Sequence, residues 1–562
     1  MVFRLLHRFE LPGFSIISIS EFLTMSLAKM SAQDQSRLPQ HEPTESSAQI
    51  NGAESLVKTL LACGVDTCFA NPGTSEMHFV AALDRIPGMR CVLGMFEGVV
   101  TGAADGYARM AGKPAATLLH CGPGLANGLA NLHNARRAQT PIVNIIGDQA
   151  TYHRPFDAPL TADTEGWARP VSVWTRTATH AAAVGAAAAA AVQAACAAPG
   201  GVASLILPSD VCWDAGGQVA APLAPIPVPK VSPDAVQQAA RVLRSGQPTL
   251  LLLTGSALEQ ASLADAHRIA AATNARLLST TANARTARGR GRYAVERLPY
   301  FGDAARAKLA GIRNIILVGT PAPATFFAYP GKSARPYPED AVIHVLARPE
   351  EDLAEALSRL AAELNAPRVD VPDTEPRNQD VATGTITSQS VARTLSALLP
   401  DQAVVVDESV SFGHAFYPGT EHAAPHDWLQ ITGGAIGDGL PLALGAAVGA
   451  PGRRVVALQA DGSGMYTPQA LWTMAREKLD VTVVVLANRK YAILMHELSS
   501  VGANPGKTAL DMLDIGNPDL DWVKIANGMG VEAARADNME RFNDLFALAN
   551  RRPGPFVIEL VI

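Results

Sequence analysis

Short apolar runs alternate with amphipathic stretches along the chain from residue 50 onward, and each run is long enough for one buried strand. In the first part of the chain the predicted strands are 66–70, 91–94, 116–120, 142–147 and 203–207. Residues 52–63 and the alanine-rich 181–198 favour helices between them. Continuously apolar strands joined by helices are typical of a parallel sheet with both faces covered, so the pattern predicts a doubly wound α/β domain.

Two connectors divide the pattern into three such blocks. The first, 222–233 (PLAPIPVPKVSP), is proline-rich, and Ser232 there is a predicted N-cap with Pro233 at the first helical position. The polar segment 367–387 is the second. The later predicted strands are 249–253, 314–318, 341–345, 403–407, 454–459, 481–488 and 556–561. The sequence thus predicts a disordered tail at 1–49 and three consecutive doubly wound parallel-sheet domains at 50–221, 233–366 and 388–562.

Composition narrows the function classes. A chain of 562 residues is too long for one core, and 48% hydrophobic with 17% charged residues fits a well-buried globular protein. The net charge of −6 argues against nucleic acid or an anionic membrane surface as a partner. Within residues 1–30, Glu10, Pro12 and Glu21 interrupt the apolar stretches, so none reaches the roughly 18 residues of a membrane span. Six scattered cysteines without a CxxC pair indicate free thiols, and we predict a cytoplasmic protein.

The last block carries the most specific motif. Its strand 454–459 is followed by Ala460-Asp461-Gly462-Ser463, and the next strand ends in Asn488, 488 − 461 = 27 residues after the aspartate. Parallel neighbours end at the same edge of a sheet, so Asp461 and Asn488 are expected together. Their side-chain oxygens are suitable ligands for a Mg²⁺ ion that also binds a diphosphate. The backbone N–H groups of Gly462 and Ser463, at the start of a helix, can donate hydrogen bonds to phosphate. The alternative is that Asp461 only caps a helix.

A second carboxylate begins a predicted helix in the first block. Glu97 lies in the stretch 96–109 (FEGVVTGAADGYAR), directly after the strand 91–94. Taken alone, an acidic residue at a helix start is explained by the helix dipole. The glycines of the stretch allow another element to pack closely against it.

Together these stretches resemble the signature of the thiamin diphosphate enzymes of the pyruvate oxidase, acetolactate synthase and benzoylformate decarboxylase group. The resemblance covers about residues 50–562, and Ala460 and Ala487 depart from the GDG and NN patterns of that group. It implies a pyrimidine-binding, a middle and a diphosphate-binding domain in that order. It also implies that Asp461, Asn488 and the main-chain oxygen of Lys490 bind Mg²⁺.

The resemblance assigns further cofactor contacts. Glu97 would hold a proton at the aminopyrimidine ring and so favour the tautomer that activates the thiazolium carbon. Ile436, within 433–441, would support the bent cofactor, or else is an ordinary core residue. Ser411, within 407–411, would contact the diphosphate. Since Glu97 and the metal site would serve one cofactor from two chains, the resemblance implies a homodimer or homotetramer with active sites between chains.

The substrate pocket leaves two activities open. By resemblance, Thr74 (within 71–76), His120, Leu494 and Glu497 would line it. His120 is either a structural histidine or the group that protonates an intermediate or positions an acceptor. Benzoylformate decarboxylases carry a second histidine where this chain has Leu298. His496 and Glu497 indicate either a polar substrate or an exposed helix turn.

We therefore predict decarboxylation of a small 2-oxo acid with carboligation, as in acetolactate synthases. The alternative is a non-ligating decarboxylase of the benzoylformate type, which His120 and Thr74 favour. One basic run is explained either by a solvated loop or by binding to a phosphate of FAD. It consists of Arg285, Arg288, Arg290 and Arg292. The cofactors that we predict are thiamin diphosphate and Mg²⁺. FAD is an alternative further cofactor for which the sequence gives no support.

Overall fold

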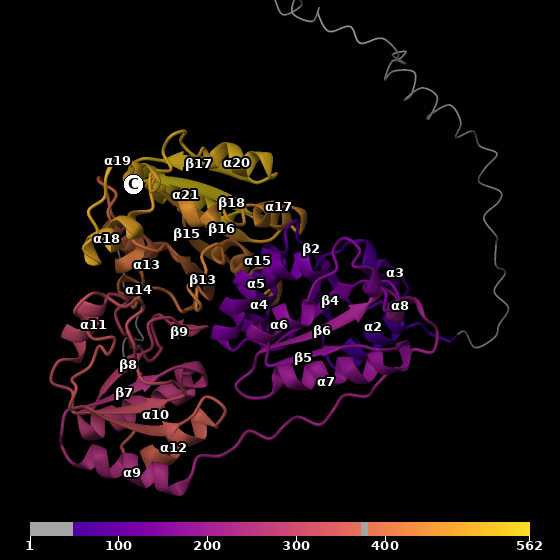
Figure 1. The fold of residues 1–562 in the computed structure, drawn as a ribbon. Coiled ribbons are helices and arrows are strands. Elements are labelled where there is room, and N and C mark those ends of the chain that lie inside the picture. The colour runs from indigo at the N-terminus through magenta and orange to yellow at the C-terminus, as the bar shows by residue number, and fades with distance from the viewer. Residues whose placement is uncertain (1–48, 372–379) are drawn as a thin grey trace, which may run out of the picture. The chain divides into compact units, whose positions relative to one another are not determined.

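The first of three β-sheets lies within residues 67–208 (Figure 1). The computed structural model describes residues 49–371 and 380–562, so the predicted tail up to residue 48 and residues 372–379 of the second connector lie outside the described residues. The order of the first sheet is β2-β1-β3-β4-β6-β5, and every pairing in it is parallel. Its strands are β1 (Thr67–Asn71), β2 (Arg90–Leu93), β3 (Ala115–Leu119), β4 (Ile142–Asp148), β5 (Trp174–Thr177) and β6 (Val202–Pro208).

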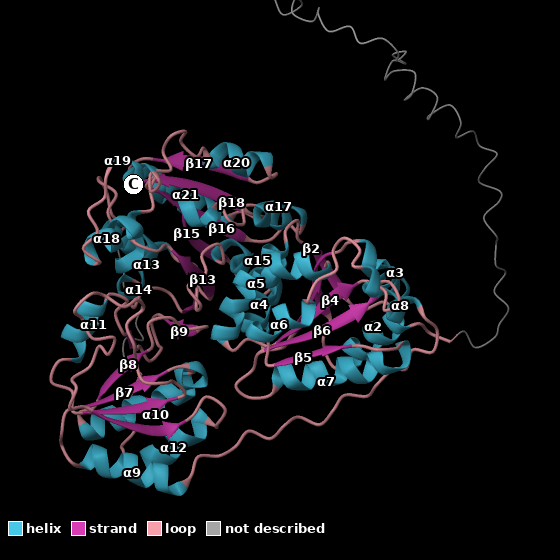
Figure 2. Ribbon diagram, viewed as in Figure 1, coloured by secondary structure: helices cyan, strands magenta, loops and turns pink. Residues whose placement is uncertain are grey.

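Helices cover both faces of this sheet, as Figure 2 shows. Successive residues of β3 enter different cores, Leu118 one hydrophobic cluster and Leu119 another, as expected for a sheet buried on both faces. The α-helices of this part are α2 (Gly52–Ala62), α3 (Met77–Arg85), α4 (Glu97–Ala111), α5 (Cys121–Ala138), α6 (Thr164–Ala168), α7 (Val184–Cys196) and α8 (Ser209–Trp213). The 3₁₀ turns are η2 (Thr74–Glu76), η3 (Arg154–Phe156), η4 (Arg169–Val171) and η5 (Ala181–Ala183).

The second sheet has the order β10-β8-β7-β11-β12 and is also parallel. Ser232 caps its first helix, since the side chain accepts the N–H of Ala235 at 3.1 Å, and Pro233 opens the helix as predicted. The strands are β7 (Thr249–Leu253), β8 (Arg276–Ser279), β10 (Glu296–Arg297), β11 (Asn314–Val318) and β12 (Val342–Ala347). The helices are α9 (Pro233–Arg244), η6 (Gly255–Leu258), α10 (Gln260–Thr273), α11 (Gly302–Leu309) and α12 (Leu353–Glu363).

The third sheet has the order β17-β18-β16-β15-β13-β14-β9, which confirms three consecutive α/β sheets. Its strands are β9 (Thr286–Arg288), β13 (Ala403–Glu408), β14 (His426–Gln430), β15 (Val455–Ala460), β16 (Val481–Ala487), β17 (Glu532–Ala536) and β18 (Phe556–Val561). Its helices are α13 (Ser388–Leu398), η7 (Phe412–Ala415), α14 (Phe416–Gly419), α15 (Gly439–Gly449), α16 (Asp461–Gly464), α17 (Gln469–Arg476), α18 (Ala492–Ser500), α19 (Lys507–Asp511), α20 (Trp522–Gly528) and α21 (Met539–Arg551).

Strand β9 is the exception to the parallel pattern. It comes from the middle block but pairs antiparallel with β14. The basic run around it is engaged in protein contacts: Arg285 pairs with Asp427 at 3.0 Å, and Arg292 donates to the carbonyl of His426 at 2.7 Å. Arg288 is buried, with its guanidinium 3.4 Å from the centroid of the Tyr417 ring. The interpretation of this run as a solvated loop is therefore wrong for β9 with its buried Arg288, whereas Arg285 is exposed, and three of the four arginines have protein partners.

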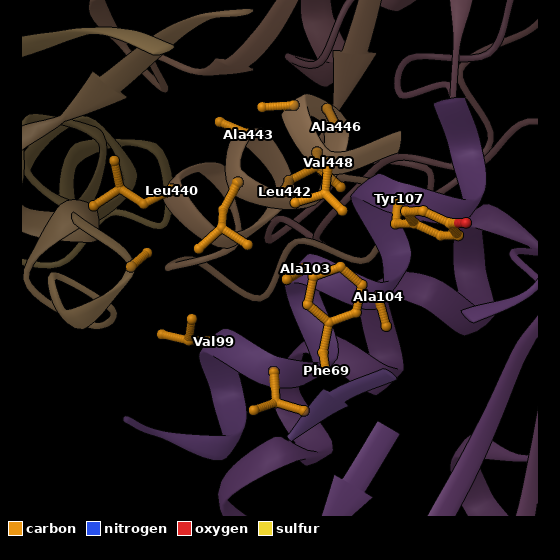
Figure 3. Close-up of a cluster of buried hydrophobic side chains, with 14 of the residues drawn as sticks. Phe69, Val99, Ala103, Ala104, Tyr107, Leu440, Leu442, Ala443, Ala446 and Val448 are labelled. Carbon is orange, nitrogen blue, oxygen red and sulfur yellow. The ribbon is translucent and has the colours of Figure 1, made fainter. Parts of the chain in front are cut away.

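Helices α4 and α15 join the first and third sheets through one continuous hydrophobic cluster (Figure 3). Glycines make the close approach possible: a Cβ on Gly106 would overlap the carbonyl oxygen of Leu442, and one on Gly445 that of Ala103. The contact matters for function because α4 begins at Glu97 and α15 begins directly after the 433–438 segment.

A helix suited to crossing a bilayer is absent from residues 49–371 and 380–562, where every helix is too short or too polar. All six cysteines lie in these ranges, and each of them is a free thiol.

Candidate active site

The turns after β15 and β16 bring the predicted metal ligands together. The two strands are parallel neighbours, with Ala460 opposite Leu486, so both turns lie at one edge of the sheet. Asp461 is buried, and the N–H groups of Gly462 and Arg489 donate to its two carboxylate oxygens at 2.8 and 2.6 Å. The N–H of Lys490 donates to Oδ1 of Asn488 at 3.1 Å. Burial raises the pKa of Asp461, and the backbone donors partly oppose this rise.

These residues fit the metal and diphosphate that the sequence motif implies. A carboxylate, a side-chain amide and a main-chain carbonyl offer only oxygen ligands, which Mg²⁺ prefers. The turn also needs its glycine, because a Cβ on Gly462 would lie 2.6 Å from the ring of Tyr491. The hydroxyl of Ser463 accepts a hydrogen bond from Nε2 of Gln459 at 2.7 Å, which leaves the backbone of the turn as the surface for a ligand.

A buried carboxylate holds the neighbouring segment 433–439, here called the wedge loop, which contains half-buried Ile436. Glu408, at the end of β13, accepts the N–H of Gly437 at 2.6 Å and that of Gly439 at 2.5 Å. Nε2 of Gln459 donates to the same carboxylate at 3.1 Å. Burial raises the pKa of Glu408, while these donors act in the opposite direction. Sequence reasoning missed both residues, although Glu408 lies within the quoted stretch 407–411.

The first block holds the wedge loop from the other side. Nδ2 of Asn134 donates to the carbonyl of Ala435 at 2.8 Å. Nδ2 of Asn131 donates to the carbonyls of Gly98 at 2.8 Å and Gly437 at 3.4 Å. The start of α4 and the wedge loop of one chain are therefore linked through a single side chain.

Two acidic groups near this junction differ in surroundings. Glu97 is buried at the first position of α4 and accepts a hydrogen bond from Nδ2 of Asn127 at 2.9 Å. Asp438, in the wedge loop, has no exposed surface. Burial, together with the negative charge of Asp105, raises the pKa of Asp438 well above its usual value.

A compact hydrogen-bonded group surrounds His120 at the end of β3. Its Nδ1 lies 2.9 Å from Oε2 of Glu76, which is 2% exposed, and 3.2 Å from Oγ of Ser75. Glu76 also accepts the N–H of Gly73 at 2.7 Å and the hydroxyl of Ser75. Sequence reasoning selected Thr74 from the stretch 71–76, whereas the structure brings its neighbours Ser75 and Glu76 to the histidine.

Cys121 follows His120 and lies against the same group, with its Sγ 3.1 Å from Oγ of Ser75. Burial raises the pKa of this thiol to about 11, which keeps it protonated near neutral pH. Its φ of +53° is left-handed, as are the φ of Val410 (+47°) and Arg489 (+60°). The three residues follow β3, β13 and β16, so each of these turns, which carry predicted site residues, holds one residue other than glycine in this unfavourable region. Ser411, predicted to contact the diphosphate, is half-buried directly after Val410.

Of the two predicted pocket residues of α18, Glu497 contacts the middle block. Leu494 is 45% exposed, and Glu497 accepts the hydroxyl of Tyr329 at 2.9 and 3.1 Å from its two oxygens. Leu298, at the position considered for a second histidine, is buried in a core cluster of the second sheet.

Comparison with known proteins agrees with this geometry. Residues 50–167 match the family description "Thiamine pyrophosphate enzyme, N-terminal TPP binding domain", and residues 413–560 match "Thiamine pyrophosphate enzyme, C-terminal TPP binding domain". These ranges contain the turns with Glu97 and His120 and those with Asp461 and Asn488.

Similar proteins carry two kinds of name. The chain is 51% identical over 516 residues to "Putative acetolactate synthase large subunit IlvX" of Mycobacterium tuberculosis, covering 91% of this chain and 99% of that protein. It is 29% identical over 539 residues to benzoylformate decarboxylase of Pseudomonas aeruginosa, and the match covers 88% of this chain and 96% of that protein. A solved structure, the thiamine diphosphate-dependent 4-hydroxybenzoylformate decarboxylase of Rhodococcus jostii RHA1, superposes with a TM-score of 0.79 at 25% identity, covering 91% of this chain and 98% of that one.

Proposed function

Because the chain belongs to the thiamine pyrophosphate enzymes, we propose that it decarboxylates a 2-oxo acid with thiamin diphosphate and Mg²⁺ and links the product to a second carbonyl compound, in the manner of an acetolactate synthase. The observation that carries the proposal is the meeting of Asp461 with the turn at 488–490, beside the wedge loop. The 51% identity to a protein named as an acetolactate synthase subunit supports the carboligation step.

The chain's own residues would divide the work between two sheets. Asp461, Asn488 and the carbonyl of Lys490 would bind Mg²⁺, and the turn at Gly462 and Ser463 and the hydroxyl of Ser411 would bind the diphosphate. Ile436 would support the rings of the cofactor, and Glu97 would hold a proton at its pyrimidine nitrogen. When bound, thiamin diphosphate supplies the carbon nucleophile and holds the electrons that remain after CO₂ leaves.

His120 has the orientation of an acid–base group. Its Nδ1 lies against the carboxylate of Glu76, so in the neutral ring the proton is on Nδ1 and Nε2 is the free acceptor. Nε2 would then face the substrate together with Thr74, Leu494 and Glu497. This arrangement favours the second candidate function, a non-ligating decarboxylase of the benzoylformate type. Nε2 would take up a proton from water and deliver it to the reacting carbon, and that protonation leads to release of an aldehyde.

Product analysis separates the two functions. We would incubate the protein, thiamin diphosphate and Mg²⁺ with pyruvate and, separately, with benzoylformate, and identify the products by mass spectrometry. A new carbon–carbon bond, such as 2-acetolactate from pyruvate, is the expected result. Free aldehyde alone would favour the second function. CO₂ release that persists undiminished in Glu97→Gln would contradict both.

We also propose a homodimer or homotetramer with active sites shared between chains. Apolar side chains near the metal turn support it, since Val410, Met465 and Tyr466 are 42%, 38% and 53% exposed in one chain. Co-expression of Glu97→Gln with Asp461→Ala tests it. In a shared-site dimer each mixed pair has one intact site, so about a quarter of the wild-type activity returns. Sites confined to one chain would give no recovery.

A cytoplasmic location remains a proposal, supported by the six free thiols. Fractionation of cells that express the tagged protein would test it, with recovery in the soluble intracellular fraction expected.

A further inference from the structure

Three different kinds of metal-binding side chain meet at the end of β3. Nδ1 of His120, a carboxylate oxygen of Glu76 and Sγ of Cys121 all lie within 4.8 Å of one another. In the part of the chain that the structure describes, no other group of three histidine, cysteine or acidic side chains meets in this way. Glu76 and Cys121 are buried, whereas the side chain of His120 is 25% exposed, so an ion would reach the group past the histidine ring.

The spacing of these atoms is close to that of a tetrahedral metal site. With metal–ligand bonds of about 2.0–2.3 Å, neighbouring ligand atoms around tetrahedral zinc are roughly 3.3–3.6 Å apart. Nδ1 of His120 lies 2.9 Å from Oε2 of Glu76. Oγ of Ser75 lies 3.2 Å from the same ring nitrogen and 3.1 Å from Sγ of Cys121. The hydroxyl of Ser75 therefore stands at the fourth corner, which it or a water molecule would occupy around the ion.

Two glycines keep the ligands in place. A Cβ on Gly73 would lie 2.3 Å from Cγ of His120, and one on Gly147 would overlap Oε1 of Glu76. Both side chains therefore lie directly against backbone. Side chains that are already held in position lose little conformational freedom when an ion binds.

The chemistry of the three groups selects the kind of ion. Mg²⁺ prefers oxygen ligands, as the turn at Asp461 offers them, whereas an imidazole nitrogen, a thiolate sulfur and one carboxylate oxygen are typical of Zn²⁺. Glu76 supplies one negative charge, and loss of the Cys121 proton would supply a second. The two charges of Zn²⁺ would then be balanced, which matters because an unpaired charge is costly among buried groups.

We propose that Glu76, His120 and Cys121 form a Zn²⁺ site, and that Zn²⁺ bound there prevents His120 from taking up a proton at Nε2. Zn²⁺ would replace the proton of the Cys121 thiol, which passes to water. It would also bind Nδ1 of His120, so that the single proton of the neutral ring moves from Nδ1 to Nε2 by exchange with water. Binding of Zn²⁺ is independent of the proposed function, and only its effect on turnover rests on that function.

Co²⁺ is the probe for binding, because its complexes with thiolate have a charge-transfer absorption band. Titration of the cofactor-free protein with Co²⁺ should give this band, and Zn²⁺ should remove it. Cys121→Ser should abolish the band, with circular dichroism showing that the variant is folded. Cys91→Ser and Cys196→Ser, at exposed thiols, are matched controls and should keep it. Absence of the band in wild type, or an unchanged band in Cys121→Ser, would overturn the site.

A second variant tests the carboxylate. Glu76→Gln keeps the thiol but removes a charged ligand, so Zn²⁺ should bind more than about 100-fold more weakly, since loss of an outer partner of a ligand already costs about 10–100-fold. The affinity is measured by competition with Co²⁺. An unchanged affinity for Zn²⁺ in this variant would also overturn the site.

Turnover tests the effect on His120. With thiamin diphosphate and Mg²⁺ in excess, Zn²⁺ that fills the site should lower kcat about 10²-fold, as loss of a positioned acid–base group does, and a zinc-selective chelator should restore it. Undiminished turnover by the Zn²⁺-loaded protein would overturn this effect. If no 2-oxo acid is turned over even without Zn²⁺, the proposed function fails, and the Co²⁺ titration still decides whether the metal site exists.

Discussion

The turns that leave the first sheet and those that leave the third satisfy their polar groups in different ways. Around His120 the side chains bond to one another: Glu76 and Ser75 both reach the ring, and Glu76 is nearly inaccessible. Around Asp461, within the part of the chain that the structure describes, the carboxylate accepts backbone N–H groups, and Oδ1 of Asn488 likewise accepts a backbone N–H. The first arrangement fixes the direction of one side chain, His120, which we propose acts on the substrate. The second is a backbone cradle that suits a ligand brought from outside.

The largest effect is expected from Glu97, which begins the helix between the two regions. Glu97→Gln keeps the hydrogen bond from Asn127 but cannot carry a proton, so kcat/KM should fall by about 10²–10⁴, as for other positioned acid–base groups. Calorimetry of the same variant should show nearly unchanged thiamin diphosphate affinity. A loss of affinity with normal turnover at saturation would show that the residue serves only binding.

The contact that joins the two regions should be intolerant of a single methyl group. Gly445→Ala places its Cβ on the carbonyl oxygen of Ala103, so the helices must separate, at a cost of about 1–3 kcal/mol. Gly528→Ala is the matched control, because its Cβ meets open space at the end of α20 and alanine is the better helix former. Thermal unfolding should show a lower transition temperature for Gly445→Ala alone, and equal transitions in the two variants would refute the argument.

In the third sheet, Glu408→Gln should weaken both the fold and cofactor binding. The carboxylate accepts two backbone N–H groups, and an amide can face only one of them with oxygen, so a buried donor loses its partner at about 1–3 kcal/mol. Thermal unfolding should show a lower transition temperature, and calorimetry should show a lower affinity for thiamin diphosphate. The exposed Glu421→Gln is the control. Normal cofactor affinity in Glu408→Gln would mean that the wedge loop keeps its position without this clamp.

In the first sheet, Glu76→Gln should act on turnover and not on the cofactor. The amide oxygen can still accept from Nδ1 of His120, but a charged acceptor is replaced by a neutral one, so the ring is held less firmly and kcat/KM should fall about tenfold. Calorimetry of the same variant should show an unchanged affinity for thiamin diphosphate. A changed affinity with an unchanged kcat/KM would place Glu76 in cofactor binding.

The smallest effect is expected for the pH dependence of stability that Asp438 causes. Burial first and Asp105 second raise its pKa in the folded protein, so folding retains a proton that the unfolded chain releases. Its contribution to stability is therefore complete below the unfolded pKa of about 3.9 and declines as pH rises. Asp438→Asn should unfold at a higher temperature than wild type at pH 8, and the gap should narrow toward pH 5. Parallel curves for the two proteins would exclude this role.

Hydrophobicity predicted the strands with long apolar runs well and the short or polar strands poorly. Strands at 249–253, 314–318 and 556–561 are observed with the predicted bounds, because each contains a run of at least three apolar, buried residues. The missed strand β14 is equally buried but carries His426 and Asp427. The negative charge of Asp427 is paired with Arg285 and Arg453, both of which lie far from it in the sequence. A local sequence pattern cannot reveal such pairing. Short β9 and β10 offer too few residues for any periodicity.

The same limit applies to the site. The meeting of Asp461 with the turn at Asn488 followed from one rule, that parallel neighbours end at a common edge. Glu76 and Glu408 lay in stretches that sequence reasoning had already singled out, yet neither was chosen. Their roles depend on partners in other turns, His120 for the first and Gly437 and Gly439 for the second, which only the folded chain brings close.

The most direct test of the account is calorimetric titration of the cofactor-free protein with thiamin diphosphate, with and without Mg²⁺, in wild type and in Asp461→Ala. The account predicts saturable binding in wild type that requires Mg²⁺ and is lost in the variant, while circular dichroism shows that the variant is folded. Absence of binding to folded wild type, or equal binding to Asp461→Ala, would contradict the assignment of this edge of the third sheet as the cofactor site.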